Sequence, residues 1–159
     1  MIFQQGVYVI DHDPDRTREF YAQAPDTCCD CSGCRNFRAA QAHFPQALRT
    51  FLEQFGIDPK KPAEMSVLYA PETDTVLYNG FYHFCGEIRE GREAYIQTGE
   101  RSFALDQRYI ISMGDPGDNE QVWFRPDCAL LDVDFPRPAA QVEVFFNLPW
   151  VLDEENTYP

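Results

Sequence analysis

Between Arg35 and Phe55, apolar residues recur at every third or fourth position, which is the spacing of one face of an amphipathic helix. The residues of this apolar stripe are Phe37, Ala40, Phe44, Leu48, Phe51, Leu52 and Phe55. Pro45 interrupts the stripe, because proline has no amide donor and its ring clashes with the carbonyl group four residues earlier. We therefore predict a helical hairpin or one kinked helix in this segment, with Gly56 as its C-terminal stop.

Most of the remaining chain shows short runs with a period of two, which is typical of β-strands. One strand is predicted over residues 5–11, followed by a polar loop that leads to the cysteines. After the helical segment, the predicted strands cover 65–70, 75–79, 81–88, 94–98, 108–113, 121–125, 129–134 and 141–147. Residues with high turn propensity separate several of them, at 72–74, 89–91 and 115–119.

Many short strands at this spacing favour a sandwich or a strongly bent antiparallel sheet. Together with the helical segment near the N-terminus, they predict an α+β fold with an antiparallel, β-sandwich-like core. The chain has 159 residues, a length that suits one domain, and it contains no internal repeat or long linker. We therefore expect residues 1–159 to form a single domain.

Acidic side chains outnumber basic ones by 26 to 13, which gives a formal net charge of −13. Such a surface repels the phosphates of nucleic acids and anionic lipid headgroups, so we expect neither nucleic acid nor membrane as a partner. The sequence has no apolar run long enough to span a bilayer, and residues 1–15 lack the pattern of a signal peptide. We expect a cytoplasmic protein whose partners are proteins, small molecules or cations.

Four of the six cysteines, Cys28, Cys29, Cys31 and Cys34, lie within seven residues of each other. In a reducing cytosol, clustered cysteines more often bind metal or carry out redox chemistry than form permanent disulfides. A Cys-x-x-Cys turn such as Cys31 to Cys34 lets two thiolates reach one zinc ion. Cys28 or Cys29 is the candidate third ligand of this zinc site.

The candidate fourth ligand is His83 or Cys85. These residues are two positions apart in a predicted strand, so their side chains are expected to leave the same face of the sheet. The leading hypothesis is a zinc-binding domain with a structural or interaction role. An iron–sulfur cluster ranks below zinc: Cys28, Cys31 and Cys34 have the spacing that opens the bacterial ferredoxin run, but Arg38 stands where the fourth cysteine is required.

Two alternatives to a metal site stay open. The first is thiol–disulfide exchange, in which Cys31 attacks a disulfide and Cys34 resolves it, with the helix start and Arg35 stabilising the thiolate. This pair resembles the thioredoxin Cys-x-x-Cys-Arg arrangement over a few residues, whereas the strand-rich chain after residue 62 argues against a thioredoxin fold. The second is a ligand- or partner-binding sandwich in which the cysteines are incidental.

Motifs for catalysis are missing from the sequence, which has no nucleotide-binding loop, hydrolase elbow or metalloprotease helix. This favours a binding protein over an enzyme. Cys31-Ser-Gly-Cys34-Arg35-Asn36-Phe37, which leads to the loop at 56–59, and the stretch 146–152 resemble a family of small uncharacterised soluble proteins of Gram-positive, Clostridia-like bacteria. The resemblance implies a soluble bacterial protein and supplies no catalytic residues.

Overall fold

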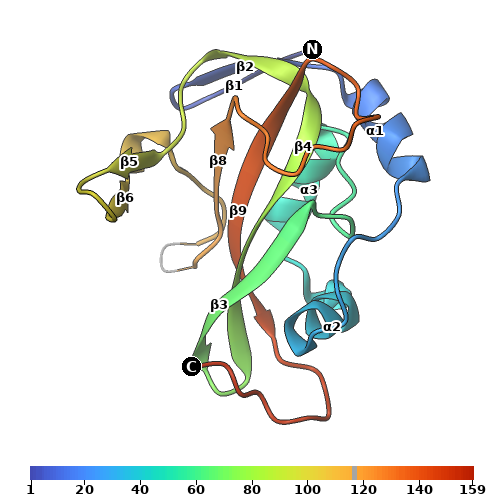
Figure 1. Cartoon of the computed structure of the whole chain (residues 1–159), viewed down its shortest axis with the longest axis vertical. Helices are drawn as coiled ribbons and strands as arrows, with labels where there is room; N and C mark the ends of the chain where they lie inside the picture. Colours follow the sequence, from blue (N-terminus) through green and yellow to red (C-terminus); the bar gives the residue numbers. More distant parts are fainter. Residues whose placement is uncertain (116–117) are drawn as a thin grey trace.

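The computed structural model describes residues 1–115 and 118–159 and has an α+β fold, as predicted (Figure 1). The strands are β1 (Ile2–Gln5), β2 (Tyr8–His12), β3 (Glu64–Glu72), β4 (Thr75–Glu90), β5 (Tyr95–Gln97), β6 (Phe103–Leu105), β7 (Ile111–Ser112), β8 (Gln121–Arg125) and β9 (Ala139–Pro149). The helices are α1 (Pro14–Gln23), α2 (Ser32–Ala39) and α3 (Gln46–Gln54), and single 3-10 turns lie at Gln41–His43 and Gln107–Tyr109.

Seven of the strands form one antiparallel sheet in the order β1-β2-β4-β9-β8-β7, with β3 paired to β4 outside this path. Strand β4 runs for 16 residues and pairs with β2, β3 and β9, so it joins all parts of the sheet. Helices cover one side of this sheet, and β5 and β6 form a separate two-stranded arm that projects from the body (Figure 1). The second layer of the fold is therefore helical, where the sequence pattern suggested a sandwich of strands.

The helical segment follows the predicted apolar stripe. Helix α2 and helix α3 are separated by a 3-10 turn, and α3 begins directly after Pro45, where the kink was predicted. Phe37 of α2 packs against Tyr78 and Phe146 of the sheet, with ring centroids 5.8 and 6.4 Å away. Phe55, which follows α3, packs against Phe84 and Phe124 in the same way. The stripe therefore forms the interface between the helices and the sheet.

The prediction of a polar loop before the cysteines was wrong, because residues 14–23 form helix α1. Asp13 caps this helix by accepting a hydrogen bond from the amide of Arg16 at 3.0 Å, and Pro14 occupies the first helical position. Aspartate as N-cap followed by proline is a favourable helix start. The helix buries only Thr17 and Tyr21 on its inner face, so it shows no long apolar stripe.

Among the predicted strands, 121–125 is confirmed residue for residue as β8, whereas 75–79 and 81–88 are parts of the continuous strand β4. The strand predicted at 129–134 is wrong, because this segment is a loop in which the Asp132 carboxylate accepts a hydrogen bond from the Asp134 amide at 2.8 Å. The turn predicted at 115–119 includes residues 116–117, which lie outside the described residues. The described part of the chain contains no helix with the length and apolar character needed to cross a membrane.

Candidate metal centre

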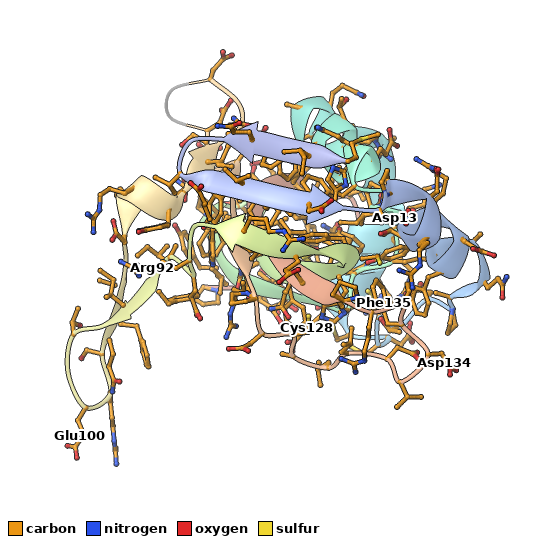
Figure 2. All side chains as sticks on the ribbon, turned by 90° about the horizontal axis from the view of Figure 1, so that it is seen from above. Asp13, Arg92, Glu100, Cys128, Asp134 and Phe135 are labelled. Atoms are coloured by element: carbon orange, nitrogen blue, oxygen red, sulfur yellow. The ribbon has the colours of Figure 1, made fainter. Side chains whose placement is uncertain are left out.

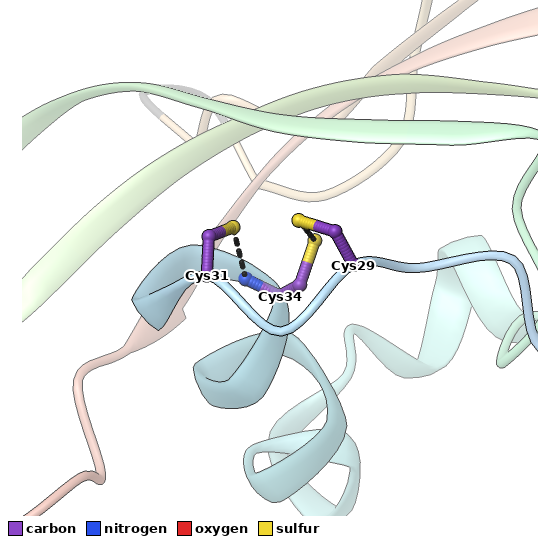
Figure 3. Close-up of side chains that lie close together, drawn as sticks. All are labelled: Cys29, Cys31 and Cys34. Atoms are coloured by element: carbon purple, nitrogen blue, oxygen red, sulfur yellow. Dashed lines mark hydrogen bonds between the residues drawn. The ribbon is translucent and has the colours of Figure 1, made fainter.

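Cys29, Cys31 and Cys34 meet at the start of helix α2, where their three sulfur atoms all lie within 4.8 Å of one another (Figure 3). Cys34 is in the first turn of the helix, and Cys29 and Cys31 belong to the segment that leads into it. Within the described residues this is the group of cysteine, histidine and acidic side chains whose ligand atoms are close enough to share one metal ion.

Cys31 is the N-cap residue of α2, with extended backbone angles (φ −67°, ψ 161°). Its sulfur accepts a hydrogen bond from the Cys34 amide at 3.4 Å. A thiol thus occupies the position that serine or aspartate usually takes at a helix start, where free amide groups and the helix dipole favour negative charge. Cys31 therefore presents its sulfur to the free amide groups at the helix start.

The sulfur atoms of Cys29 and Cys34 lie 3.6 Å apart (Figure 3). Cys34 is buried and its thiol points to the carbonyl oxygen of Met65 at 4.0 Å, whereas Cys29 is exposed. A hydrogen bond from the Cys31 backbone lowers the pKa of Cys29, and burial raises the pKa of Cys34. The cluster therefore contains an exposed thiol with a lowered pKa, that of Cys29, and a buried thiol with a raised pKa, that of Cys34.

Two arginines of α2 hold the cysteine-bearing loop by its backbone. Arg38 donates hydrogen bonds to the carbonyl oxygens of Cys28 and Cys29 at 3.4 and 3.0 Å, and Arg35 donates to that of Asp30 at 3.2 Å. Arg35 also forms an ion pair with Glu154 of the C-terminal segment. These arginines therefore position the loop, so that Cys29 faces the helix start.

The C-terminal segment packs directly against the start of α2. The Asn36 side chain is fully buried, donates to the Pro149 carbonyl at 3.1 Å and accepts from the Val151 amide at 2.8 Å. The Tyr158 hydroxyl accepts a hydrogen bond from the Gly33 amide at 3.1 Å. The two stretches on which the family resemblance was based are thus in contact with each other, which gives both a common structural role beside the cysteines.

The cluster opens into a cleft of about 470 Å³ between α2, β3 and the C-terminal segment. The residues that line this cysteine cleft are Thr27, Cys28, Cys29, Cys31, Gly33, Cys34, Ala63, Glu64, Met65, Ser66, Val67, Leu130 and Tyr158. Glu64, Leu130 and Tyr158 come from distant parts of the chain, and no motif in the sequence marks them. Their proximity to the cysteines is a product of the fold.

The other predicted ligands lie outside the three-sulfur group. Cys28 reaches the wall of the cysteine cleft but packs against the hydrophobic core, and burial raises its pKa. His83 is 4% exposed, and its Nε2 atom lies 3.2 Å from Oε1 of Gln141. Cys85 is 1% exposed and lies two residues further along β4. Three sulfurs are therefore close enough to share one metal ion, and of the other candidates only Cys28 lines the same cleft.

Comparisons of the chain with protein-family models, with curated proteins and with solved structures found no match. The chemistry of the site is therefore inferred from the geometry of its own residues.

Proposed function

We propose that the protein binds zinc through the thiolates of Cys29, Cys31 and Cys34 and that the metal site has an interaction role. The observation that carries this proposal is the convergence of three sulfur atoms within 4.8 Å at a helix start. Zinc–sulfur bonds of about 2.3 Å place the sulfurs of a tetrahedral site roughly 4 Å apart. Only small side-chain rotations are needed to bring the three sulfurs to this spacing.

The surroundings of the cluster favour a cation. A coordinating metal ion deprotonates its thiol ligands, because it supplies the positive charge that a buried thiolate lacks. This deprotonation by the metal matters most for Cys34, because burial favours its neutral thiol in the absence of a metal. The net charge of −13 also attracts cations to the protein surface.

The role of the site follows from the number of its ligands. Structural zinc sites are usually closed by four protein ligands, whereas sites with three protein ligands keep one position for water or another molecule. Cys28 lines the cysteine cleft but lies outside the three-sulfur group. The fourth position would then open to the cysteine cleft, which suits a site that recruits an external donor.

The test is the metal content of the untagged protein purified anaerobically, measured by mass spectrometry together with a free-thiol count. We expect one zinc ion per chain in the wild type and its loss in Cys29→Ser, Cys31→Ser and Cys34→Ser. Cys128→Ser is the matched control, because Cys128 is a half-buried thiol outside the cluster. Metal-free wild-type protein that also fails to bind added zinc would contradict the proposal.

A second candidate function is thiol–disulfide exchange, favoured by the 3.6 Å separation of the Cys29 and Cys34 sulfurs. In this reaction the exposed Cys29 thiolate attacks a substrate disulfide and releases one substrate thiolate. Cys34 then attacks the mixed disulfide and releases the second thiolate, so the protein is oxidised as the substrate is reduced. The sequence suggested Cys31 as the attacking residue, and this candidate assigns the attack to Cys29, because Cys29 is exposed, has a lowered pKa and has its sulfur 3.6 Å from that of Cys34.

The two functions differ in the residues they require. An insulin reduction assay should depend on Cys29 and Cys34 and tolerate Cys31→Ser if exchange is the function. Zinc binding should depend on all three residues. A protein that binds zinc with full occupancy and lacks reductase activity would exclude the second candidate.

A further inference from the structure

The cysteine cleft is one end of a longer groove. It shares Thr27, Ala63 and Leu130 with a neighbouring pocket of about 140 Å³. This middle pocket in turn shares Phe20, Ala24, Pro25 and Asp132 with a third cleft of about 440 Å³. The three form one groove along the loop between β8 and β9, which carries Cys128, Asp134 and Phe135 (Figure 2).

The middle pocket is mostly apolar and matches one large side chain in size. Phe20, Phe135 and Leu130 contribute to its wall, and the buried His83 also lines it. Because an apolar cavity of about 150 Å³ is large enough for benzene, this pocket can hold the ring of a phenylalanine or the side chain of a leucine. It therefore provides an anchor point within the groove.

The rim of the groove is acidic. Glu19, Glu64, Asp132 and Asp134 line it, and none of them forms an ion pair with a basic group in the described part of the chain. The two basic side chains of the groove are bonded to carbonyl oxygens: Arg16 to that of Arg137 at 3.3 Å and Lys61 to that of Tyr21 at 2.7 Å. Four carboxylates against these two cations leave the lining with a formal charge of −2, which attracts a cationic occupant.

Leu130 stands where the cysteine cleft meets the middle pocket. It has a left-handed backbone conformation (φ 53°) and a side chain that is 70% exposed. Bulky residues rarely adopt this conformation, and such strain is concentrated at binding and catalytic sites. An exposed leucine held in a strained conformation between two clefts is therefore suited to contact a bound molecule.

We infer that this groove binds an extended peptide segment of a partner protein. The segment is cationic, inserts one large apolar side chain into the middle pocket, and supplies a cysteine or histidine as the fourth ligand of the metal ion. The assignment of a fourth metal ligand to the peptide rests on the proposed function. Open clefts in a row suit an extended chain, and pockets for alternate side chains give specificity in this mode of recognition.

The experiment is a selection from a random displayed peptide library with the zinc-loaded full-length protein. We expect enriched peptides to combine lysine or arginine with one phenylalanine, leucine or methionine and one cysteine or histidine. A synthetic copy of the most enriched peptide is then titrated by fluorescence anisotropy. Replacement of its cysteine or histidine by serine should weaken binding roughly tenfold or more.

Variants of the protein locate the binding site. Leu130→Gly and the double variant Glu64→Lys/Asp134→Lys should each weaken binding of this peptide roughly tenfold. Glycine suits the positive φ at position 130, so the first variant keeps the fold. The matched controls are Val133→Gly, at a 90% exposed position of the same loop, and Glu100→Lys, at the tip of the β5–β6 arm (Figure 2). Both controls should bind the peptide like the wild type.

Failure of the inference is distinguishable from failure of the proposed function, because zinc affinity is measured separately by competition with a chromophoric chelator. Zinc binding without peptide enrichment would overturn the inference alone. Peptides whose affinity is unchanged by Leu130→Gly and by the charge reversals would also overturn it. Peptides that bind equally well with and without zinc would overturn the fourth-ligand assignment, and a protein that binds no zinc would overturn the proposed function as well.

Discussion

The hydroxyl group of Tyr21 bonds both backbone groups of His83: it donates to the carbonyl oxygen at 2.8 Å and accepts from the amide at 3.2 Å. Along this edge of β4, pairing with β3 ends at Phe81 and pairing with β2 begins at Gly86. A side chain of helix α1 therefore replaces the missing strand at His83. The backbone groups of β4 in this gap are buried, so they need such a partner.

Tyr21→Phe removes only the hydroxyl group and leaves both backbone groups of His83 without this partner. We expect the free energy of unfolding to fall by ~1–3 kcal/mol, because unpaired buried polar groups keep their desolvation cost. Urea denaturation followed by circular dichroism measures the change. Tyr69→Phe is the matched control at a 46% exposed position and should have little effect. Equal stability of the two variants would show that the Tyr21 hydroxyl has no such role.

Gly33→Ala tests the contact between the C-terminal segment and the start of α2. A Cβ atom at position 33 would lie 2.8 Å from the Tyr158 hydroxyl oxygen. Alanine is favoured over glycine in a helix by about 1 kcal/mol, so the substitution would stabilise the protein if the space were free. We expect it to destabilise the wild type, because Tyr158 must move.

The same substitution in a Tyr158→Ala background provides the control. There the clash with the hydroxyl is gone and only the 3.0 Å approach to Cγ2 of Val67 remains, so Gly33→Ala should cost less. A double-mutant cycle from thermal or urea unfolding gives the coupling between the two positions. A coupling energy near zero would mean that Tyr158 does not rest on Gly33 in solution.

The burial of His12 leads us to expect a lower free energy of unfolding in mild acid. Its side chain is 2% exposed, stacks on Phe55 with ring centroids 4.4 Å apart, and has no hydrogen-bond partner for either ring nitrogen within the described residues. Burial lowers the pKa of His12 below the ordinary value of 6.5. The unfolded chain therefore binds this proton more readily, so stability falls as the pH drops below about 6.5 and levels off below the folded-state pKa.

His12→Phe keeps an aromatic ring on Phe55 and cannot be protonated. We expect a smaller loss of stability between pH 7 and pH 5 than in the wild type, measured from urea unfolding at each pH. His43→Gln is the control, because His43 is exposed. Burial also lowers the pKa of His83, so part of the acid sensitivity should persist in His12→Phe. An unchanged pH dependence in His12→Phe would exclude the His12 contribution.

Chelation of the metal should leave the fold intact. Helix α2 is held by Asn36, Tyr158 and the apolar stripe independently of any ion. We therefore expect an unchanged circular dichroism spectrum after chelation, and stabilisation on adding zinc by about 2.7 kcal/mol at a free zinc concentration 100 times the dissociation constant. Cys34→Ser should lose this stabilisation. Unfolding on chelation would instead indicate a zinc ion that is required for folding.

The helical segment that follows the cysteines could be predicted from the sequence, because the residues that contact the sheet recur at the spacing of one helical face. The apolar stripe that includes Phe37 and Phe55 needs only the spacing of one helical face, and Pro45 marks the break by its own chemistry. Helix α1 could not be found from a stripe, since only Thr17 and Tyr21 are buried on it. Its N-terminal signal, Asp13 followed by Pro14, was present in the sequence.

At 129–134 the sequence pattern predicted a strand where the structure has a loop. Its residues alternate as in a strand, but a strand needs a partner, and Val133 is 90% exposed. Pairing is a property of the sheet as a whole. The central strand β4, broken at Gly80 in the prediction, is continuous because Gly80 allows the close approach of the Glu64 carbonyl oxygen, 2.3 Å from where a Cβ atom would lie.

For the candidate site, the sequence alone determined that Cys31 and Cys34 stand together at a helix start, because only two residues within one helical turn separate them. Only the tertiary structure decided that Cys29 joins them while Cys28 packs against the core, since the loop direction depends on the backbone contacts of Arg38. It also placed Leu130 at the cleft. Contacts between residues distant in the chain depend on the folded arrangement of the sheet, which no local pattern encodes.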